Sequence, residues 1–324
     1  RRVQGDEMLD AMYPAASYAF EASPPLPDRD EWKAMIMGYI GQVEGVTCFV
    51  ACEDEDPVAC AASTAMTQNV RGALLGMGGV WGVATRPAAR RKGYCRRLIG
   101  RLLDVDHQSS RPLSVLYPFR ESFYQRMGYV TLPQVPKAHF KPSALAPLLK
   151  MDLAGEIELM GIDEGYETYR DYLRQIQPQI HGLALSDLGN KANAEKNRDW
   201  LALATVDDQP VGLMLYELRG TGDHKVTLRV SRFYYGTSQG RYLLLRWIAR
   251  HIDQAQEAEM WLAPFEMPET WLADVGVTVE TEGWAPMGRV VDVAQLDDRG
   301  VQVGPGSFSA RITDPLCPWN EGVW

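Results

Sequence analysis

Residues 83–98 read Val83-Ala-Thr-Arg-Pro-Ala-Ala-Arg90-Arg91-Lys92-Gly93-Tyr94-Cys95-Arg96-Arg97-Leu98, and this stretch decides the fold. An apolar, β-prone run at 79–83 leads into it, and apolar residues at helical spacing follow it at 98–103. The sequence therefore predicts a strand, a basic turn with one glycine, and the start of a helix. The first turn of a helix has backbone N–H groups without partners and a partial positive charge. We expect such a turn, with its added arginines and lysine, to bind a phosphate or diphosphate.

The glycine pattern narrows the choice of phosphate ligand. A dinucleotide-binding turn needs three glycines and an acidic residue about twenty positions later, and a nucleoside-triphosphate loop needs Gly-Lys-Ser/Thr. The turn at 90–96 has neither pattern. A lone glycine signature is weak evidence, and the alternative interpretation is a helix start with a solvated basic face.

A second informative segment lies at 113–130. Leu113-Ser-Val-Leu-Tyr117 predicts a buried strand. Ser122-Phe-Tyr124-Gln-Arg-Met-Gly128-Tyr129-Val130 predicts a short helix that ends at a glycine and is followed by another strand. The helix after Gly93 and the strand at 113–117 therefore separate the basic turn from the short helix that contains Phe123 and Tyr124.

Both segments resemble the acetyl-coenzyme-A site of the GNAT N-acetyltransferases. Arg90-x-x-Gly93-x-Cys95 is similar to the family motif Gln/Arg-x-x-Gly-x-Gly/Ala, and Val-x-Thr-x-Pro precedes it at the family's distance. A cysteine stands where the family has Gly or Ala, which is a modest change because cysteine is small and mostly apolar in behaviour. The resemblance implies acetyl-CoA as cosubstrate, bound by Val83, Thr85, Arg90, Arg91, Lys92, Gly93, Tyr94, Cys95 and Arg96.

Phe123-Tyr124-x-x-x-Gly128-Tyr129 resembles the GNAT segment that packs on the pantetheine arm of the coenzyme. This resemblance implies that Tyr124 is the general acid that protonates the leaving thiolate. An ordinary tyrosine has a pKa of about 10, so its hydroxyl is protonated at neutral pH, as a donor must be. The alternative is a core tyrosine whose hydroxyl is satisfied elsewhere.

Length and composition fit a globular enzyme with more than one domain. The chain has 324 residues, more than one core usually holds, with 46% apolar and 23% charged residues. It has neither a membrane-length apolar run nor a signal-peptide pattern. Its five cysteines, at 48, 52, 60, 95 and 317, predict reduced thiols in the cytoplasm. Cys48-x-x-x-Cys52 lacks a second ligand pair, so we expect no metal.

The net charge of −9 and the pI of about 5.2 argue against a nucleic-acid partner and suit a small cationic amine. The acidic residues expected near the acceptor amine follow an early proline-rich loop: they are Asp28, Asp30 and Glu31. Their alternative interpretation is a solvated loop and a helix cap. None of the histidines, at 107, 139, 181, 224 and 251, lies in a recognisable base motif.

Helices and strands alternate along the chain, which predicts an α+β domain with a mixed sheet at 1–145. The helices are expected at 7–20, 30–39 and after Gly93, and the strands at 48–53, 58–68, 77–84, 113–117 and 129–132. Prolines at 133, 136, 142 and 147 predict a linker. Strands at 200–206, 210–216 and 226–234, then a glycine turn, a helix and a strand at 259–262, repeat the pattern without the basic triplet. Residues 146–290 are therefore expected to form a second, degenerate fold of the same type.

The tandem arrangement and the phrase Arg311-Ile-Thr-Asp-Pro-Leu-Cys-Pro-Trp-Asn-Glu-Gly-Val-Trp324 are similar to the enhanced intracellular survival family of GNAT acetyltransferases. The resemblance implies that 291–324 begin a sterol-carrier-protein-like domain, and that the protein is a homo-oligomer. We expect both ends of the sequence to be incomplete. In that family the C-terminal carboxylate is the general base, and this role is not carried over to Trp324.

These observations together predict a cytoplasmic, acetyl-CoA-dependent N-acetyltransferase that acts on a primary amine by direct attack. An aminoglycoside, a polyamine or a lysine side chain would satisfy the acceptor chemistry. The alternatives are a longer acyl donor and a non-catalytic module that binds a ligand or partner on the same scaffold.

Overall fold

The computed structural model describes residues 1–21, 23–186, 191, 199–220, 225–281, 283, 285–297, 300–301 and 304–324. They form two compact units, each assembled from segments that are distant in the sequence. Unit 1 comprises Arg1–Leu132, Gln177–Asn193 and Ala285–Trp324. Unit 2 comprises Pro133–Ile176 and Ala194–Trp284.

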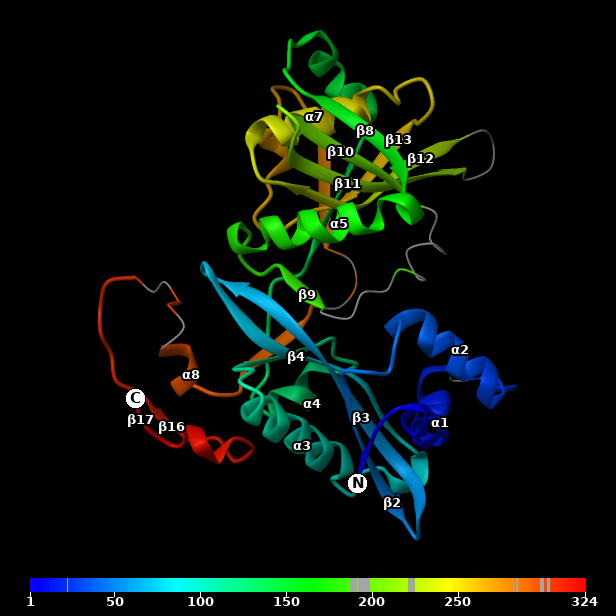
Figure 1. Ribbon diagram of the computed structural model, residues 1–324, viewed down its shortest axis with the longest axis vertical. Helices are drawn as coiled ribbons and strands as arrows, with labels where there is room; N and C mark the ends of the chain where they lie inside the picture. Colours follow the sequence, from blue (N-terminus) through cyan, green and yellow to red (C-terminus); the bar gives the residue numbers. More distant parts are fainter. Residues whose placement is uncertain are drawn as a thin grey trace. The chain divides into compact units, whose positions relative to one another are not determined.

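Unit 1 is built on an eight-stranded mixed sheet (Figure 1). Its strand order is β1-β2-β3-β4-β5-β15-β6, and β9 pairs with the far end of β3. All neighbours are antiparallel except β4 and β5, which are parallel. The strands are β1 (Arg2–Val3), β2 (Val46–Glu53), β3 (Asp56–Val70), β4 (Ala73–Thr85), β5 (Leu113–Leu116), β6 (Val130–Thr131), β9 (Ala184–Ser186) and β15 (Met287–Val290).

Helices cover both faces of this sheet because side chains along a strand alternate between its faces. Cys60 and Ala62 of β3 pack with α1 (Asp6–Glu21) and α2 (Arg29–Ile40) in one core cluster. Ala59 and Ala61 pack with α3 (Tyr94–Gln108) and α4 (Glu121–Gln125) in another. In Figure 1 α3 lies on one side of the sheet and α1 on the other. The result is a three-layer α/β/α unit.

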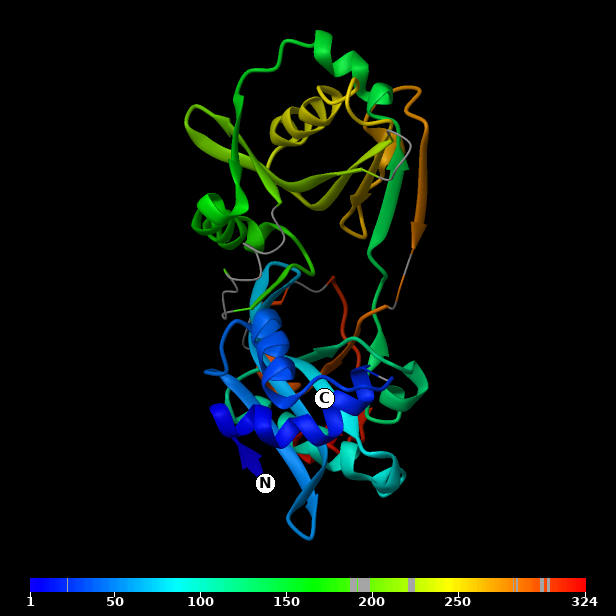
Figure 2. The ribbon, with the colours of Figure 1, turned by 90° about the vertical axis from the view of Figure 1, so that its right-hand side faces the viewer.

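Unit 2 repeats this plan with a seven-stranded sheet, in the order β14-β7-β13-β12-β11-β10-β8 (Figure 2). Its single parallel pair is β12 with β13. The main core lies between the sheet and α7 (Ser238–Ala249) with the 3-10 helix η2 (Pro142–Lys150), and α5 (Ile162–Ile176) covers the other face. The strands are β7 (Pro136–Phe140), β8 (Glu156–Gly161), β10 (Trp200–Val206), β11 (Gln209–Gly220), β12 (Val226–Tyr235), β13 (Glu257–Trp261) and β14 (Val277–Thr281).

Each sheet contains one strand whose neighbours in the sheet are distant from it in the sequence. We call this placement of β15 in unit 1 and of β7 in unit 2 the strand exchange. β15 lies between β5 and β6, with Met287 opposite Leu116 and Thr131. β7 lies between β13 and β14, with Ala138 opposite Met260 and Val279. Chain order and sheet order therefore differ, and neither unit is one continuous stretch of sequence.

This exchange explains the differences from the expected boundaries at 145 and 290. The predicted linker instead contains β7, because its prolines flank the strand or begin it and leave the interior of the strand free to pair. The segment 177–193 belongs to unit 1, where the buried Asn69 side chain donates to the Gln177 carbonyl at 2.7 Å. The strands and helices predicted from periodicity are confirmed, including the hairpin turned by Asp207 and Asp208, both with positive φ.

The segment that follows β15 also packs in unit 1. It contains α8 (Ala294–Asp297), the 3-10 helix η5 (Pro318–Asn320) and a two-stranded sheet of β16 (Arg311–Ile312) with β17 (Gly322–Val323). The remaining 3-10 helices are η1 (Pro87–Ala89), η3 (Gln177–Gln179) and η4 (Pro268–Thr270). Among the described helices, none is long and apolar enough to span a bilayer.

The strand exchange predicts the behaviour of a fragment. Residues 1–145 lack β15, so β5 and β6 lose the strand between them and the core loses Met287 and Val291, both fully buried. We expect this fragment to show no cooperative thermal transition, whereas the full chain unfolds cooperatively. Near-UV circular dichroism and calorimetry measure this, and a sharp transition in the fragment would contradict the assignment of β15.

Candidate active site

The parallel strands β4 and β5 separate before β4 ends. β5 pairs only with Met77 to Val80, while β4 continues to Thr85. Among the described strands, the last five residues of β4 have a partner only on the β3 side. Polar backbone groups of β4 beyond Val80 therefore have no described strand as partner on the β5 side and can meet a ligand there; we call this unpaired region the wedge.

A β-bulge lies at the start of this wedge. Gly82 and Val83 of β4 stand opposite Ala61 alone, because Ala62 pairs with Trp81 and Cys60 with Ala84. Gly82 has φ +62°, and an added Cβ would lie 2.6 Å from the Met12 side chain. A bulge of this kind bends the strand and re-aims the residues that follow. The bulge directly follows Trp81, which is the neighbour of the last β4 residue that pairs with β5.

The basic turn joins the end of β4 to the first turn of α3. Gly93 precedes the helix with φ +80°, a conformation that glycine adopts without strain. Among the described residues, no side chain caps this helix, and Arg97 is its first residue whose N–H bonds back to a carbonyl, that of Gly93 at 3.2 Å. In the described part of the chain, no oxygen accepts from the N–H groups of 91–96. These amides are free for an anion at the positive end of the helix dipole.

The cations of the turn differ in how far they are already paired. Lys92 contacts the Glu53 carboxylate at 2.8 Å, and the Tyr94 hydroxyl donates to the same carboxylate at 2.7 Å. These contacts, Lys92 first, lower the pKa of Glu53 below its ordinary value. Arg90 reaches back to the Thr85 carbonyl at 3.3 Å. Glu53 is a member of this site that the sequence analysis missed, because no motif marks a strand residue that meets the turn through space.

Arg91 and Arg96 are exposed, and no carboxylate among the described residues forms an ion pair with either of them. Two full charges therefore stand beside the unpartnered amides. This combination of fixed N–H dipoles and unpaired guanidinium groups suits a diphosphate.

Cys95 and Thr85 connect the helix to the strand. The Cys95 Sγ lies 3.0 Å from the Thr85 Oγ1, and burial raises the pKa of the thiol above its ordinary value. The thiol is therefore protonated at neutral pH and acts as a small, half-buried side chain. Cys95 thus fills the position that a glycine or alanine has in the GNAT motif that the turn resembles.

Tyr124 lies in α4 with 3% of its surface exposed. Its ring packs edge-on against Phe119 and Phe123, with centroid distances of 5.7 and 5.0 Å. Burial, and next the nearby Cys95 thiol, raise the pKa of the Tyr124 hydroxyl well above its ordinary value. Within the described residues that hydroxyl has no hydrogen-bond partner. A protonated donor that lacks an internal acceptor is available to a bound ligand.

The glycine of the aromatic motif has a clear physical role. Gly128 has φ +81°, and a Cβ there would lie 3.1 Å from the guanidinium of Arg289 on β15. Tyr129, the next residue, is buried and bonds to Ser114 through its hydroxyl at 2.7 Å. The glycine thus ends α4 and leaves room for an arginine that is distant in the sequence.

The corresponding turn of unit 2 has its polar groups already partnered. The Thr237 side chain caps α7 by accepting from the Gly240 N–H at 3.1 Å. Arg241 lies 3.7 Å from the buried Glu266 carboxylate, to which the Tyr235 hydroxyl and the Trp271 indole also donate. The turn of unit 2 therefore offers neither an uncapped helix start nor an unpaired cation.

Two of the acidic residues expected near an acceptor form a helix cap. The Asp28 carboxylate accepts from the Glu31 N–H at 2.8 Å, and the Glu31 carboxylate accepts from the Asp28 N–H at 3.2 Å. This reciprocal capping box begins α2. Asp30 is exposed and takes no part in the cap.

The histidines have structural surroundings. His107 lies 2.6 Å from the Asp292 carboxylate, His139 lies 2.6 Å from that of Glu280, and His251 lies 2.9 Å from the Trp247 carbonyl. His181 accepts from the backbone N–H of Arg71 at 3.1 Å, and residue 224 lies outside the described residues. The described part of the chain holds no cluster of three or more His, Cys, Asp or Glu side chains suited to a metal ion.

Two family models match the chain, each described as an acetyltransferase (GNAT) domain. One covers residues 1–132 and the other residues 186–290. The chain therefore carries two GNAT domains in tandem, with mixed α/β sheets, and its class is that of the N-acetyltransferases. A sequence comparison with curated proteins finds no match.

Solved structures share the fold over the whole chain. A conserved protein from Enterococcus faecalis V583, described as a probable N-acyltransferase, matches with a TM-score of 0.78 and 19% identity, covering 100% of this chain and 81% of that one. A GCN5-related N-acetyltransferase from Anabaena variabilis has the same TM-score and coverage at 18% identity. Eis1 from Mycobacterium abscessus matches with a TM-score of 0.76 and 16% identity, again covering 100% and 81%. At these identities the likeness shows the fold.

A substitution at Gly128 tests the packing after α4. Gly128→Ala combines a left-handed φ with a close contact to Arg289, so we expect a loss of about 1–3 kcal/mol of stability. Gly220→Ala is the control, since a Cβ there meets nothing within 4 Å and its φ is not positive. Chemical denaturation measures both variants. Equal stability of the two would contradict the arrangement.

Proposed function

We propose that unit 1 transfers an acetyl group from acetyl-CoA to a primary amine. One observation carries the proposal. Amides and arginines without partners among the described residues stand at the start of α3, at the end of the β4–β5 wedge. The Cys95 thiol of the same helix lies near the Tyr124 hydroxyl. A diphosphate on the turn would let the pantetheine arm enter the wedge and bring the thioester towards Tyr124.

The phosphate end of the coenzyme is bound by the turn 90–96. Its negative oxygens accept from the backbone N–H groups and pair with Arg91 and Arg96. Lys92 is shared with Glu53, so its contribution is smaller than that of a free lysine. Val83 and Thr85 line the strand side, and Cys95 fills the position beside Thr85.

The reaction is a direct transfer. A neutral amine attacks the carbonyl carbon of the thioester, a C–N bond forms, and the C–S bond breaks as the tetrahedral intermediate collapses. Backbone N–H groups of the splayed β4 end, near Val83, stabilise the developing oxyanion. The Tyr124 hydroxyl gives its proton to the leaving thiolate, and the proton lost by the amine leaves the site with a base or solvent.

The acceptor is a cationic molecule with a primary amine, such as an aminoglycoside, a polyamine or a lysine side chain. The net charge of −9 favours the arrival of such a substrate. Asp30, an exposed residue in the first turn of α2, is the one of the three that is left to meet it, since Asp28 and Glu31 cap the helix.

The five free cysteines support a reducing compartment. The tandem folds, with the phrase at 311–324, support membership of the enhanced intracellular survival family.

Coenzyme binding tests the turn. Gly93→Asp places a carboxylate beside the amides at a left-handed position, so we expect the Kd for coenzyme A to rise at least about tenfold, or about 1.4 kcal/mol. Arg101→Gln makes the net charge more negative by the same amount, in a later turn of α3, and this control variant is expected to bind coenzyme A normally. Calorimetry measures both, with one site per chain expected. No binding by the wild-type chain, or binding unaffected by Gly93→Asp, would sink the proposal.

The general acid is tested by Tyr124→Phe. We expect kcat to fall by about 10²–10⁴ while the Kd for coenzyme A stays unchanged, because the hydroxyl acts on the leaving thiolate. Tyr117→Phe, an identical chemical change at an exposed residue of the preceding loop, is the control. Thioester consumption with a panel of amines measures turnover. Normal kcat in Tyr124→Phe would remove this residue from the mechanism.

The pH profile follows from the raised pKa of Tyr124. Because burial favours the protonated hydroxyl, the donor stays protonated beyond the ordinary tyrosine pKa of about 10. We expect kcat to hold or rise between about pH 8 and about pH 10, since more of the acceptor amine is also neutral there. If kcat instead decreases as the pH is raised from about 8 to about 9, and Tyr124→Phe shows no such decrease, the hydroxyl is losing its proton too early and its burial is contradicted.

A further inference from the structure

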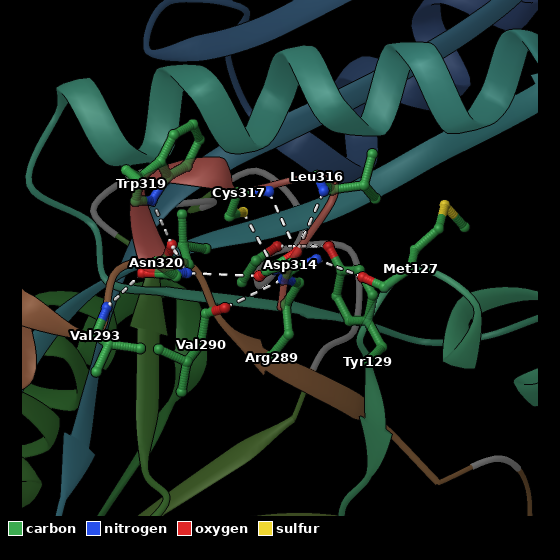
Figure 3. A network of polar contacts seen from close by, with 12 residues as sticks. Met127, Tyr129, Arg289, Val290, Val293, Asp314, Leu316, Cys317, Trp319 and Asn320 are labelled. Carbon is green, nitrogen blue, oxygen red and sulfur yellow. Dashed lines mark hydrogen bonds and ion pairs between the residues drawn. The ribbon is translucent and has the colours of Figure 1, made fainter. Parts of the chain in front are cut away.

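The guanidinium of Arg289 is buried in unit 1, where only 2% of its side chain is exposed. Figure 3 shows the polar contacts around it. It stands on β15, between the end of α4 and the C-terminal segment 311–324, which we call the C-terminal clip. A buried cation is costly unless hydrogen bonds and an opposite charge compensate it. The partners of Arg289 therefore indicate what it is held in place to do.

Four acceptors surround Arg289. Its Nε donates to the Val290 carbonyl at 3.1 Å, and one terminal nitrogen donates to the Met127 carbonyl. The other terminal nitrogen meets the Asp314 carboxylate and lies 3.1 Å from the Cys317 sulfur. The planar fork of an arginine can hold two such directions at fixed geometry. Arg289 thus joins α4 on one side to the C-terminal clip on the other.

The α4 side of this contact is the turn that follows Tyr124. The N–H groups of Met127 and Tyr129 both donate to the Tyr124 carbonyl, at 2.8 and 3.2 Å. The guanidinium also lies over the Tyr129 ring, 5.9 Å from its centroid. Arg289 therefore fixes the carbonyl of Met127 and the ring of Tyr129, the two residues whose amides hold the end of α4.

The opposite charge comes from the C-terminal clip. Asp314 is oriented there by the N–H groups of Leu316 and Cys317, which donate to its second oxygen at 3.3 and 3.2 Å. Asn320 fastens the same clip by donating to the Val291 carbonyl at 2.9 Å. The clip thus presents one prepared carboxylate to Arg289.

We infer that Arg289 is a positioning residue for Tyr124, and that the C-terminal clip sets turnover by supplying Asp314 as its counter-charge. The inference rests on the proposed function of Tyr124 as general acid. Displacement of a donor by about 1 Å can cost about 10² in rate, so a small shift of α4 is enough to be measured. The coenzyme phosphates bind elsewhere, on the turn 90–96, and coenzyme affinity should not change.

Asp314→Asn tests the charge while it keeps the shape of the side chain, and Arg289→Lys tests the fork. We expect kcat to fall at least about tenfold in each, with the Kd for coenzyme A within about twofold of the wild-type value. Asp292→Asn is the matched control. It weakens a contact of the same region, Asp292 to His107, which lies on α3 and not on α4. Unchanged kcat in Asp314→Asn, or an equal loss in the control, would overturn the inference.

A double-mutant cycle separates positioning from general destabilisation. If Arg289 acts through the Tyr124 hydroxyl, Asp314→Asn should lower kcat in the wild-type background and have little further effect in Tyr124→Phe. Independent losses that multiply would mean that the clip acts without Tyr124. A normal kcat in Tyr124→Phe alone would instead overturn the proposed acid, so the two failures are distinct. Should Arg289→Lys fail to fold, Asp314→Asn decides by itself.

Discussion

The early end of the pairing between β4 and β5 is the constraint on which the site depends. Val80 is the last residue of β4 with a β5 partner, and a bulge at Gly82 and Val83 follows it. Backbone groups at a strand end need hydrogen-bond partners. β4 leads into the start of α3, whose own first amides have no partner among the described residues. One feature of sheet geometry thus brings strand end, helix start and aromatic helix to the same place.

Unit 2 shows that early separation of a parallel pair does not by itself leave a helix start unpaired. Unit 2 also has a parallel pair that separates early, since β13 pairs with β12 only as far as Val230. Its turn, however, satisfies itself through the cap of Thr237 and the pairing of Arg241 with Glu266. In unit 1 the glycine at 93 supplies no side-chain cap, and Arg91 and Arg96 find no carboxylate among the described residues. The proposed anion site therefore depends on groups that unit 1, in its described residues, leaves unpaired.

Local pattern was sufficient to predict much of this from the sequence. Alternation along β3 and the helical spacing after Gly93 are properties of neighbouring residues, so the strands, α3 and the basic turn could be inferred. Tyr124 entered through a resemblance, and the structure adds its burial and the lack of a partner for its hydroxyl among the described residues. β15, β7 and Arg289 could not be inferred, because their partners are distant in the sequence and only the folded chain brings them together. Glu53 was missed for the same reason, and the proline-marked linker misled because prolines also flank strands.

The interleaved order of segments has a consequence for biosynthesis. Leu116 must wait for Met287, about 170 residues later, before its sheet is complete. At about 5–20 residues per second, a translating ribosome leaves the first sheet unfinished for about 10–35 s. During that interval the edge of β5 is open to wrong partners, and pairing over such long separations is slow. We expect the nascent chain to need chaperone protection until β15 has been synthesised.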